Sequence, residues 1–508
     1  MSTVYLNGTS LTLQDVENVA RKGYKVEIAP EAKKLIRECS ESVLKWVEEG
    51  RVVYGITTGF GDLASVAIPR DKVRQLQENL LMSHACGVGE DYPEDVVRAI
   101  MLLRVNTLTR GYSGISLATL QQMVDLLNFG IHPVVPQQGS VGASGDLCPL
   151  SHIAIALIGI GEVVYKGKKM PAADALAAVG LKPVELQPKE GLALNNGTTV
   201  MTAVAALCTI DAAKMVKNAD IVAALSAEAL HAVPYAFDQR THDLRPHLGQ
   251  SVVAQNMRRL LEGSEIVEHY KKDRVQDAYS LRCLPQVHGT SRDALNYVRE
   301  KIEVEINSVT DNPIVFHKDG EAISGGNFHG EPMAMAMDFF GIAAAEIASI
   351  SERRISRLVD HKLSDLPPFL VKDSGVNSGF MIPQYAAAAI VSENKVLAHP
   401  SVVDSIPTSA NQEDHVSMGG YSARKGRQIL DNVNKVIAIE ALNAAQGMDF
   451  RTPLKPGKGT AAAHAEFRKY VPFYEKDQYM HPLVIKSLEL VENGSLIKAA
   501  EAAVGELN

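Results

Sequence analysis

The stretch AMDFFGIAAAEIASISERRISRLVDH, residues 336–361, decides the fold class. Apolar and small residues recur in it at steps of three and four, which is the spacing of one face of an α-helix. These residues are Phe340, Ala344, Ile347, Ser351, Ile355 and Leu358. The pattern predicts one long helix that packs closely against neighbours.

Further helix signals surround this stretch. Thr12 and Asp15 form a capping-box pattern, and Gly23 stands where that helix should end. Pro30 suits a first helical position, and the helical spacing that follows it stops at Gly50. The alanine-rich stretches 385–391 and 439–447 also indicate closely packed helices, whereas residues 161–170 have the pattern of a β-hairpin. We therefore expect a mainly α protein, with a mixed region over 1–200 and a helical bundle over 201–508.

Composition narrows the class of protein. The chain has 508 residues, enough for two or three packed regions, and a net charge of −8. A protein that grips nucleic acid or an anionic membrane is usually basic, so neither partner is expected. The first ten residues lack a secretory signal pattern, and the apolar run 153–161 is too short to span a bilayer. The five cysteines are scattered without a C-x-x-C pair, which favours reduced thiols and a cytoplasmic location.

The segment QQGSVGASGDLCPLSH, residues 137–152, carries the chemistry that needs explaining. A hydrolase nucleophile elbow has the pattern G-x-S-x-G, but Asp146 occupies the position of its last glycine. The dinucleotide, phosphate-loop and metal-ligand spacings are absent from the sequence, and no metal is expected. The segment therefore does not match a nucleophile elbow, and the triplet alone is weak evidence for any one function.

A third explanation uses the backbone of the segment. The nitrogen of Gly145 can attack the carbonyl carbon of Ala143 and close a five-membered ring, and loss of two waters leaves a methylidene group on the former Ser144. Ring closure needs a tightly bent backbone, which Gly142 and Gly145 permit. The product is an electrophile, which the side chains of the twenty amino acids do not supply.

Polar, glycine-rich segments accompany this segment along the chain, several of them in loops of its second half. They carry dense clusters of Asn, Gln, Tyr, Arg, His and Glu, and loops on a rigid scaffold are where function concentrates. The relevant segments are VYGITTGFG (53–61), NLLMSHACGVG (79–89), GSVGASGDLCPLSHIA (139–154), LALNNGTT (192–199), QDAYSLRCLPQVHG (276–289), NSVTDNPIVF (307–316), SGGNFHGEPMA (324–334) and TSANQEDHVSMG (408–419).

Taken together and in this order, these segments closely resemble the aromatic amino acid ammonia-lyase and aminomutase family. The resemblance implies that Ala143, Ser144 and Gly145 become 4-methylidene-imidazol-5-one (MIO), without an external cofactor. It also implies a long central helical bundle and a homotetramer whose active sites are shared between chains. Residues 53–61 are similar to the family's lid loop.

Within the family, two residues resemble the members that act on histidine. These are His84, in the ring-selecting segment, and Glu413, where relatives specific for phenylalanine or tyrosine typically have glutamine. An imidazole and a carboxylate can hydrogen-bond both nitrogens of a substrate imidazole, whereas a phenyl ring would leave them unpaired. The chain departs from the histidine-specific pattern at Asn195, Thr199, Leu284 and His288.

The resemblance also implies a reaction and a set of roles. L-Histidine would lose ammonia to give trans-urocanate, with Tyr54 as the first candidate for the base that removes the β-proton and Tyr279 as the second. Arg282 would hold the substrate carboxylate, because its planar fork suits a carboxylate. The remaining expected site residues are Asn196 and Gln276 as orienting groups, Phe328 beside the ring, and Asp146 as a support for cyclisation.

Three alternatives stay open at this point. A tyrosine or phenylalanine ammonia-lyase, or a 2,3-aminomutase, would use the same MIO group. A catalytically silent helical assembly protein could keep the fold without the ring. Hydrolysis at Ser144 would predict labelling by a serine-directed phosphonate.

Overall fold

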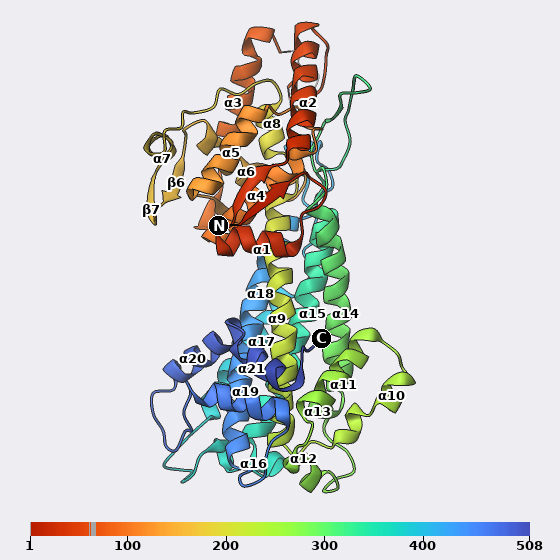
Figure 1. Cartoon of the computed structure of the whole chain (residues 1–508), viewed down its shortest axis with the longest axis vertical. Helices are drawn as coiled ribbons and strands as arrows, with labels where there is room; N and C mark the ends of the chain where they lie inside the picture. The colour runs from red at the N-terminus through yellow and green to blue at the C-terminus, as the bar shows by residue number, and fades with distance from the viewer. Residues whose placement is uncertain (1, 60, 62–67) are drawn as a thin grey trace. The chain divides into compact units, whose positions relative to one another are not determined.

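The computed structural model of the chain describes residues 2–59, 61 and 68–508 (Figure 1). Phe60, in the predicted lid loop, lies outside the described residues. Within the described part, helices α1–α21 dominate and the strands β1–β9 are short. The prediction of a mainly α protein is confirmed.

The chain forms two compact units, and each is built from three separate segments. Unit 1 consists of Met1–Ile210, Arg299–Asp338 and Pro400–Arg424, and unit 2 consists of Asp211–Val298, Phe339–His399 and Lys425–Asn508. The predicted division into domains at residue 200 stays a prediction. Each compact unit also contains segments from further along the chain.

Unit 1 mixes helices with small sheets. Its helices are α1 (Leu13–Lys22), α2 (Pro30–Glu48), α3 (Val73–His84), α4 (Glu94–Thr109), α5 (Leu117–Phe129), α6 (Leu147–Leu157), α7 (Ala172–Ala178) and α8 (Glu190–Asn195), with short 3₁₀ turns at Arg70–Lys72 and Ser409–Asn411. Its strands are β1 (Thr3–Leu6), β2 (Lys25–Ile28), β3 (Val88–Asp91), β4 (Ile131–Pro133), β5 (Pro136–Gln138), β6 (Glu162–Tyr165), β7 (Lys168–Pro171), β8 (Ile314–Phe316) and β9 (Glu321–Ile323).

The small sheets follow local sequence signals. β1 and β2 pair in parallel, whereas β3–β5, β4–β6–β7 and β8–β9 are antiparallel. The predicted hairpin is β6–β7, which turns at Lys166 and Gly167, both with positive φ. In α1 the Thr12 hydroxyl and the Asp15 carboxylate cap each other's backbone, and Gly23 ends the helix in the left-handed conformation. These local predictions are confirmed.

Unit 2 is helical. Its helices are α10 (Gln239–Asp243), α11 (Leu248–Leu260), α12 (Glu265–Tyr270), α13 (Tyr279–Arg282), α16 (His361–Ser364), α17 (Met381–Leu397), α19 (Lys458–Arg468), α20 (His481–Glu492) and α21 (Ser495–Val504), with short 3₁₀ turns at Pro234–Phe237 and Pro368–Leu370. Four long helices contribute residues to both units, and they are α9 (Thr199–Ala229), α14 (Leu284–Glu305), α15 (Glu331–Val359) and α18 (Gly419–Asp449).

The predicted long helix is α15, which begins five residues earlier and ends two residues earlier than predicted. It stops at Val359 because Asp360 leaves the helical conformation and caps α16 with its side chain, which accepts a hydrogen bond from the Lys362 N–H. Both α9 and α15 are long and apolar enough to cross a membrane, but 78% and 67% of their apolar windows are buried in the protein. Burial of this extent is typical of core helices.

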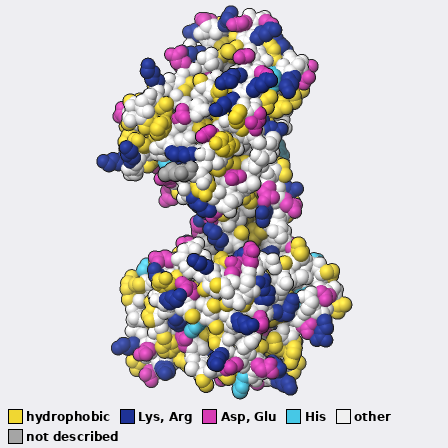
Figure 2. Space-filling model, in the orientation of Figure 1, with side chains coloured by type: hydrophobic (Ala, Val, Ile, Leu, Met, Phe, Trp, Pro, Cys, Tyr) yellow, Lys and Arg dark blue, Asp and Glu magenta, His cyan; other side chains and the backbone are white. Residues whose placement is uncertain are grey.

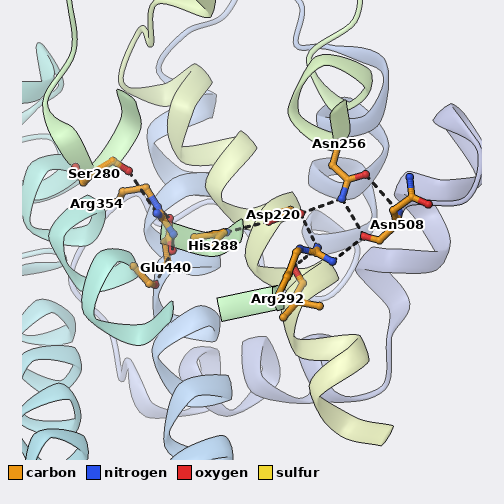
Figure 3. A network of polar contacts seen from close by, with 10 residues as sticks. Asp220, Asn256, Ser280, His288, Arg292, Arg354, Glu440 and Asn508 are labelled. Carbon is orange, nitrogen blue, oxygen red and sulfur yellow. Dashed lines mark hydrogen bonds and ion pairs between the residues drawn. The ribbon is translucent and has the colours of Figure 1, made fainter. Parts of the chain in front are cut away.

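Buried polar pairs join the long helices within unit 2 (Figure 3). Arg354 on α15 and Glu440 on α18 form a fully buried ion pair of 2.5 Å. On α9, Asp220 accepts from Arg292 at 2.6 Å and contacts His288 at 2.9 Å. Although burial opposes ionisation, these two partners hold the pKa of Asp220 below its usual value. His288, one of the departures from the histidine-specific pattern, therefore has a structural role inside unit 2, as the buried partner of Asp220.

Positive and negative side chains are mixed on the face of the protein seen in Figure 2. Lys and Arg side chains lie among Asp and Glu side chains there. Together with the net charge of −8, this mixed face offers no basic patch of the kind that binds nucleic acid.

Candidate functional site

The Ala-Ser-Gly triplet lies in a tight turn just before α6. Gly142 and Gly145 have φ values of 69° and 72°, in the left-handed region that favours glycine. A Cβ atom on Gly145 would lie 2.2 Å from the carbonyl carbon and oxygen of Gly197. The two backbones are in direct contact, so position 145 requires glycine for conformation and for space.

Hydrogen bonds hold the turn from the neighbouring 196–201 segment. The Asn196 side chain donates to the Ser144 carbonyl at 2.7 Å, and the Asp146 N–H donates to the Gly197 carbonyl at 2.7 Å. The Asp146 carboxylate accepts from the N–H groups of Val200 and Met201, each at 2.9 Å. The bend is therefore fixed by partners outside the triplet.

Asp146 is fully buried, and its environment changes its titration. Burial raises the pKa of Asp146 to about 6, although the N–H groups of Met201 and Val200, the Ser140 hydroxyl and the charge of Arg104 all favour the carboxylate. A carboxyl group that titrates near neutrality can exchange protons with its surroundings. This property suits the support of cyclisation that the family resemblance implies for it.

A cavity of about 670 Å³ opens beside the triplet, and the described residues that line it all belong to unit 1. Six of the predicted site residues line this cavity: Tyr54, His84, Ser144, Asn196, Phe328 and Glu413. Leu76, Leu80, Leu147 and Leu192 provide apolar walls. A concave, largely apolar pocket with a few converging polar groups is typical of a site for a small molecule.

Glu413 and Ser144 meet in this cavity although 269 positions separate them in the chain. The Ser144 hydroxyl donates to Oε1 of Glu413 at 2.5 Å, and the Thr408 hydroxyl donates to Oε2 at 2.7 Å. Thr408 thus orients the carboxylate. Loss of the Ser144 hydroxyl as water would remove the donor to Oε1 and leave that oxygen able to accept from a ligand.

His84 ends α3 and lies on the same cavity. Its Nδ1 is 3.0 Å from the Ser83 hydroxyl, which itself donates to the Leu80 carbonyl at 3.1 Å. Burial lowers the pKa of His84, against a backbone hydrogen bond to Leu80 and the negative charge of Glu413. A lowered pKa keeps the imidazole neutral at neutral pH, where it can exchange hydrogen bonds with a neutral heterocycle.

Tyr54 occupies the cavity wall from the loop after α2, where its hydroxyl oxygen accepts from the Gly61 N–H at 3.1 Å. Phe328 and Asn196 reach the cavity from different loops. An oriented hydroxyl, an aromatic side chain and an amide therefore share one cavity with Ser144.

Six predicted residues are not among those that line this cavity. Ala143, Gly145 and Asp146 belong to the turn beside it, and the other three lie elsewhere. Gln276, Tyr279 and Arg282 belong to unit 2. Tyr279 is 70% exposed, and the guanidinium of Arg282 lies 4.8 Å from the centre of its ring. The Arg282 Nε atom donates to the Asp277 carbonyl at 3.1 Å, which leaves the terminal nitrogens of the fork for other partners.

Some cavity residues were not predicted individually. They are Asn79, Asn312 and Ser409, with Thr408 behind Glu413. All four stand in the polar segments 79–89, 307–316 and 408–419 that the sequence singled out, but segment composition does not tell which side chain faces a cavity.

The residues present fit a ring made from their own backbone. Two left-handed glycines bend the chain at Ala143 and Ser144, and the contact of Gly145 with Gly197 leaves no room for a side chain. Within the described residues, no group of three or more His, Cys, Asp or Glu side chains is arranged to hold a metal ion.

Comparison with known proteins agrees with this geometry. The model of a family described as aromatic amino acid lyase matches residues 11–469. Histidine ammonia-lyase from Alkaliphilus oremlandii (strain OhILAs) is 54% identical over 504 residues, which cover 99% of each chain. Histidine ammonia-lyase from Clostridium tetani (strain Massachusetts / E88) is 53% identical over 505 residues, covering 99% of this chain and 98% of that one.

Solved structures share the fold over nearly the whole chain. The crystal structure of histidine ammonia-lyase from Trypanosoma cruzi superposes with a TM-score of 0.92 at 42% identity, covering 99% of this chain and 96% of that one. The tyrosine aminomutase from Streptomyces globisporus has a TM-score of 0.95 at 37% identity, and the match covers both chains completely. The shared fold spans enzymes named for different substrates, so the side chains in the cavity must distinguish between them.

Proposed function

The chain belongs to the aromatic amino acid lyase family, and we propose that it eliminates ammonia from L-histidine to give trans-urocanate. The enzyme is a carbon–nitrogen lyase, and its MIO group forms autocatalytically from Ala143, Ser144 and Gly145. The ring supplies an electrophilic carbon for the substrate amine. The observation that carries the choice of histidine is that His84 and Glu413 line one cavity together with Ser144.

The polar pair at the cavity accounts for recognition of the substrate ring. The neutral imidazole of His84 and the carboxylate of Glu413 provide partners for the two nitrogens of a substrate imidazole. A phenyl or phenol ring would leave one or both of these groups without a partner, and buried unsatisfied polar groups cost about 1–3 kcal/mol each. The pair therefore favours histidine over phenylalanine and tyrosine.

Elimination of ammonia also needs a base that removes the β-proton of the substrate. Tyr54 is the first candidate for the base because its hydroxyl lines the cavity and is oriented by the Gly61 N–H. Tyrosine is among the side chains that transfer protons in general acid–base catalysis. Asn196 orients the ring-forming turn through its hydrogen bond to the Ser144 carbonyl. Phe328 forms part of the cavity wall.

We also propose that the protein is a homotetramer in which another copy of the chain completes the site. Gln276, Tyr279 and Arg282 lie in a segment of unit 2 that exposes large apolar side chains, with Val275 97% and Tyr279 70% exposed. Exposed apolar groups beside an arginine fork are typical of a surface that a partner covers. In the assembly, Arg282 from a neighbouring copy would hold the substrate carboxylate, Gln276 would orient the substrate, and Tyr279 would be the second candidate for the base.

We place this enzyme in the cytoplasm. No disulfide joins any of the five cysteines, all of which belong to the described residues. A reducing compartment fits this chemistry.

Product analysis tests the proposed function. The purified enzyme is incubated separately with L-histidine, L-tyrosine and L-phenylalanine, and the absorbance of urocanate, coumarate or cinnamate is followed. We expect urocanate from histidine only. Formation of coumarate, cinnamate or a β-amino acid without urocanate would refute the substrate and favour the alternative lyase or aminomutase activity.

Two matched variants separate the candidate bases. Tyr54→Phe and Tyr279→Phe each remove one hydroxyl and keep the ring. We expect a fall in kcat of about 10²-fold or more for Tyr54→Phe, the usual contribution of a general base. A small effect at Tyr54 together with a large one at Tyr279 would transfer the role to Tyr279.

A further inference from the structure

Arg104 is a buried cation that the proposed reaction does not use. It lies in α4 and its side chain is fully buried. Its guanidinium donates to the Ala193 carbonyl and to the Thr199 hydroxyl, the latter at 3.3 Å. Ala193 belongs to α8 and Thr199 is the first residue of α9, so one guanidinium joins both sides of the 196–198 turn.

This turn is the segment that holds the triplet. Asn196 donates to the Ser144 carbonyl, and the Gly197 carbonyl accepts from the Asp146 N–H, both at 2.7 Å. The backbone of Gly197 also touches that of Gly145, because a Cβ atom on Gly145 would lie 2.2 Å from the Gly197 carbonyl group. Any movement of the turn therefore changes the bend of residues 143–146.

Gly197 has further close neighbours. A Cβ atom on Gly197 would lie 2.1 Å from the carbonyl oxygen of Thr310 and 2.8 Å from a guanidinium nitrogen of Arg104. Gly197 thus lies in close contact with the triplet, with Thr310 and with Arg104. Arg104 therefore restricts the space that is open to this turn.

We propose that Arg104 is a positioning residue for ring formation, because its hydrogen bonds to Ala193 and Thr199 hold the 196–198 turn in contact with the triplet. The bend brings the Gly145 nitrogen to the Ala143 carbonyl carbon. The N–H of Gly145 adds across that carbonyl, and the resulting hydroxyl leaves as water with the Ser144 N–H proton as a C=N bond forms. A second water takes the hydroxyl of Ser144 and its Cα proton, so that two waters leave in total.

The chemistry of arginine suits this position better than that of lysine. Burial lowers the pKa of Arg104 to about 10, against the charges of Asp311 and Asp146, so the guanidinium stays protonated at neutral pH. Its planar fork reaches two acceptors on different helices at once, whereas an ammonium group is a single point on a flexible stem. Asp311 already pairs with Lys189 at 2.7 Å, both fully buried, which leaves Arg104 to serve the turn.

Mass spectrometry of intact protein tests this role without any substrate, so its result is independent of the proposed activity. Ring formation removes two waters, about 36 Da, and the fraction of full-length chain that has lost this mass is followed over time after expression. The variants are Arg104→Met and Arg104→Lys, and the control is Arg98→Met. Arg98 is another buried arginine of α4, but its guanidinium donates to the carbonyl of Val19 at 3.0 and 2.8 Å and not to the turn.

We expect Arg98→Met to complete the ring at the wild-type rate. Arg104→Met should form it at least about tenfold more slowly, since two hydrogen bonds from a charged donor are lost, and Arg104→Lys should lie between them. Folding is checked by thermal unfolding. A folded Arg104→Met chain that loses 36 Da at the wild-type rate would overturn the proposal. If Arg104→Met does not fold, Arg104→Lys and Thr199→Val decide, and wild-type ring formation in both would overturn it equally.

Discussion

Replacing Gly145 by alanine tests whether the bend of the triplet depends on contact between two backbones. The added Cβ atom would lie 2.2 Å from the Gly197 carbonyl group, whereas real Cβ contacts are essentially never below 3.0 Å. The two segments must therefore separate by about 0.8 Å. Such a shift would stretch the hydrogen bond from the Asp146 N–H to the Gly197 carbonyl, now 2.7 Å, beyond its useful length.

The cost follows from two contributions. An alanine at a φ of 72° costs roughly 1–2 kcal/mol relative to glycine. A buried backbone donor that loses its partner costs about 1–3 kcal/mol more. The bent conformation of Gly145→Ala should therefore be less stable by about 2–5 kcal/mol, which lowers its population by a factor of about 30 or more.

Gly130→Ala is the matched control. Gly130 ends α5 at a φ of 73°, and a Cβ atom there would meet nothing within 4 Å. This variant carries the same conformational cost without the contact, so it should form the ring normally and lose only about 1–2 kcal/mol of stability. The assay is the loss of about 36 Da from the intact chain, together with urea unfolding of both variants. Equal ring formation and equal stability in the two variants would refute the reasoning.

Three further predictions concern charged side chains of the cavity and of the core. Glu413→Gln should lower kcat/KM for L-histidine by about 10²-fold or more, because a charged acceptor for the substrate ring is lost, and an unchanged kcat/KM would remove Glu413 from the recognition site. Lys189→Met should destabilise unit 1 by about 3–5 kcal/mol in urea unfolding, because it leaves the Asp311 carboxylate buried without the cation 2.7 Å away; a double variant that also carries Asp311→Leu should recover most of this loss. The pKa of Asp146 is raised to about 6, so the folded chain keeps this proton where the unfolded chain has lost it, and stability falls by at most about 3 kcal/mol as pH rises from about 4 to about 6. Asp146→Asn lacks this loss, so its stability relative to the wild type should be greater at pH 7 than at about pH 4.5; a pH-independent difference would contradict the raised pKa.

Elements of the fold that depend on residues close together in the chain were predictable from the sequence. The capping box of α1, the β6–β7 hairpin and the helical course of α15 were predictable because each depends on neighbours within a few residues. The end of α15 was predicted two residues too late because the capping side chain of Asp360 competes with continuation of the helix. Periodicity alone does not register that competition.

The same distinction between near and distant residues holds at the site. The family resemblance carried by the polar segments was enough to predict the kind of electrophile and five of the residues that share a cavity with Ser144. Sequence order did not place Thr408 behind Glu413 or Arg104 behind Gly197, because each contact joins residues far apart in the chain. It also did not assign Gln276, Tyr279 and Arg282 to a different unit from the cavity.

Local spacing and backbone freedom are properties of short segments, so the order of amino acids alone predicts a mainly helical protein and a glycine-flanked serine able to form a ring. The need for glycine at position 145 for space as well as conformation depends on the folded chain, since the obstacle is the backbone of Gly197, 52 positions away along the chain. The raised pKa of Asp146 and the meeting of His84, Ser144 and Glu413 on one cavity depend on the folded chain as well. Burial and the approach of distant charges produce these properties, and both arise only when the chain folds.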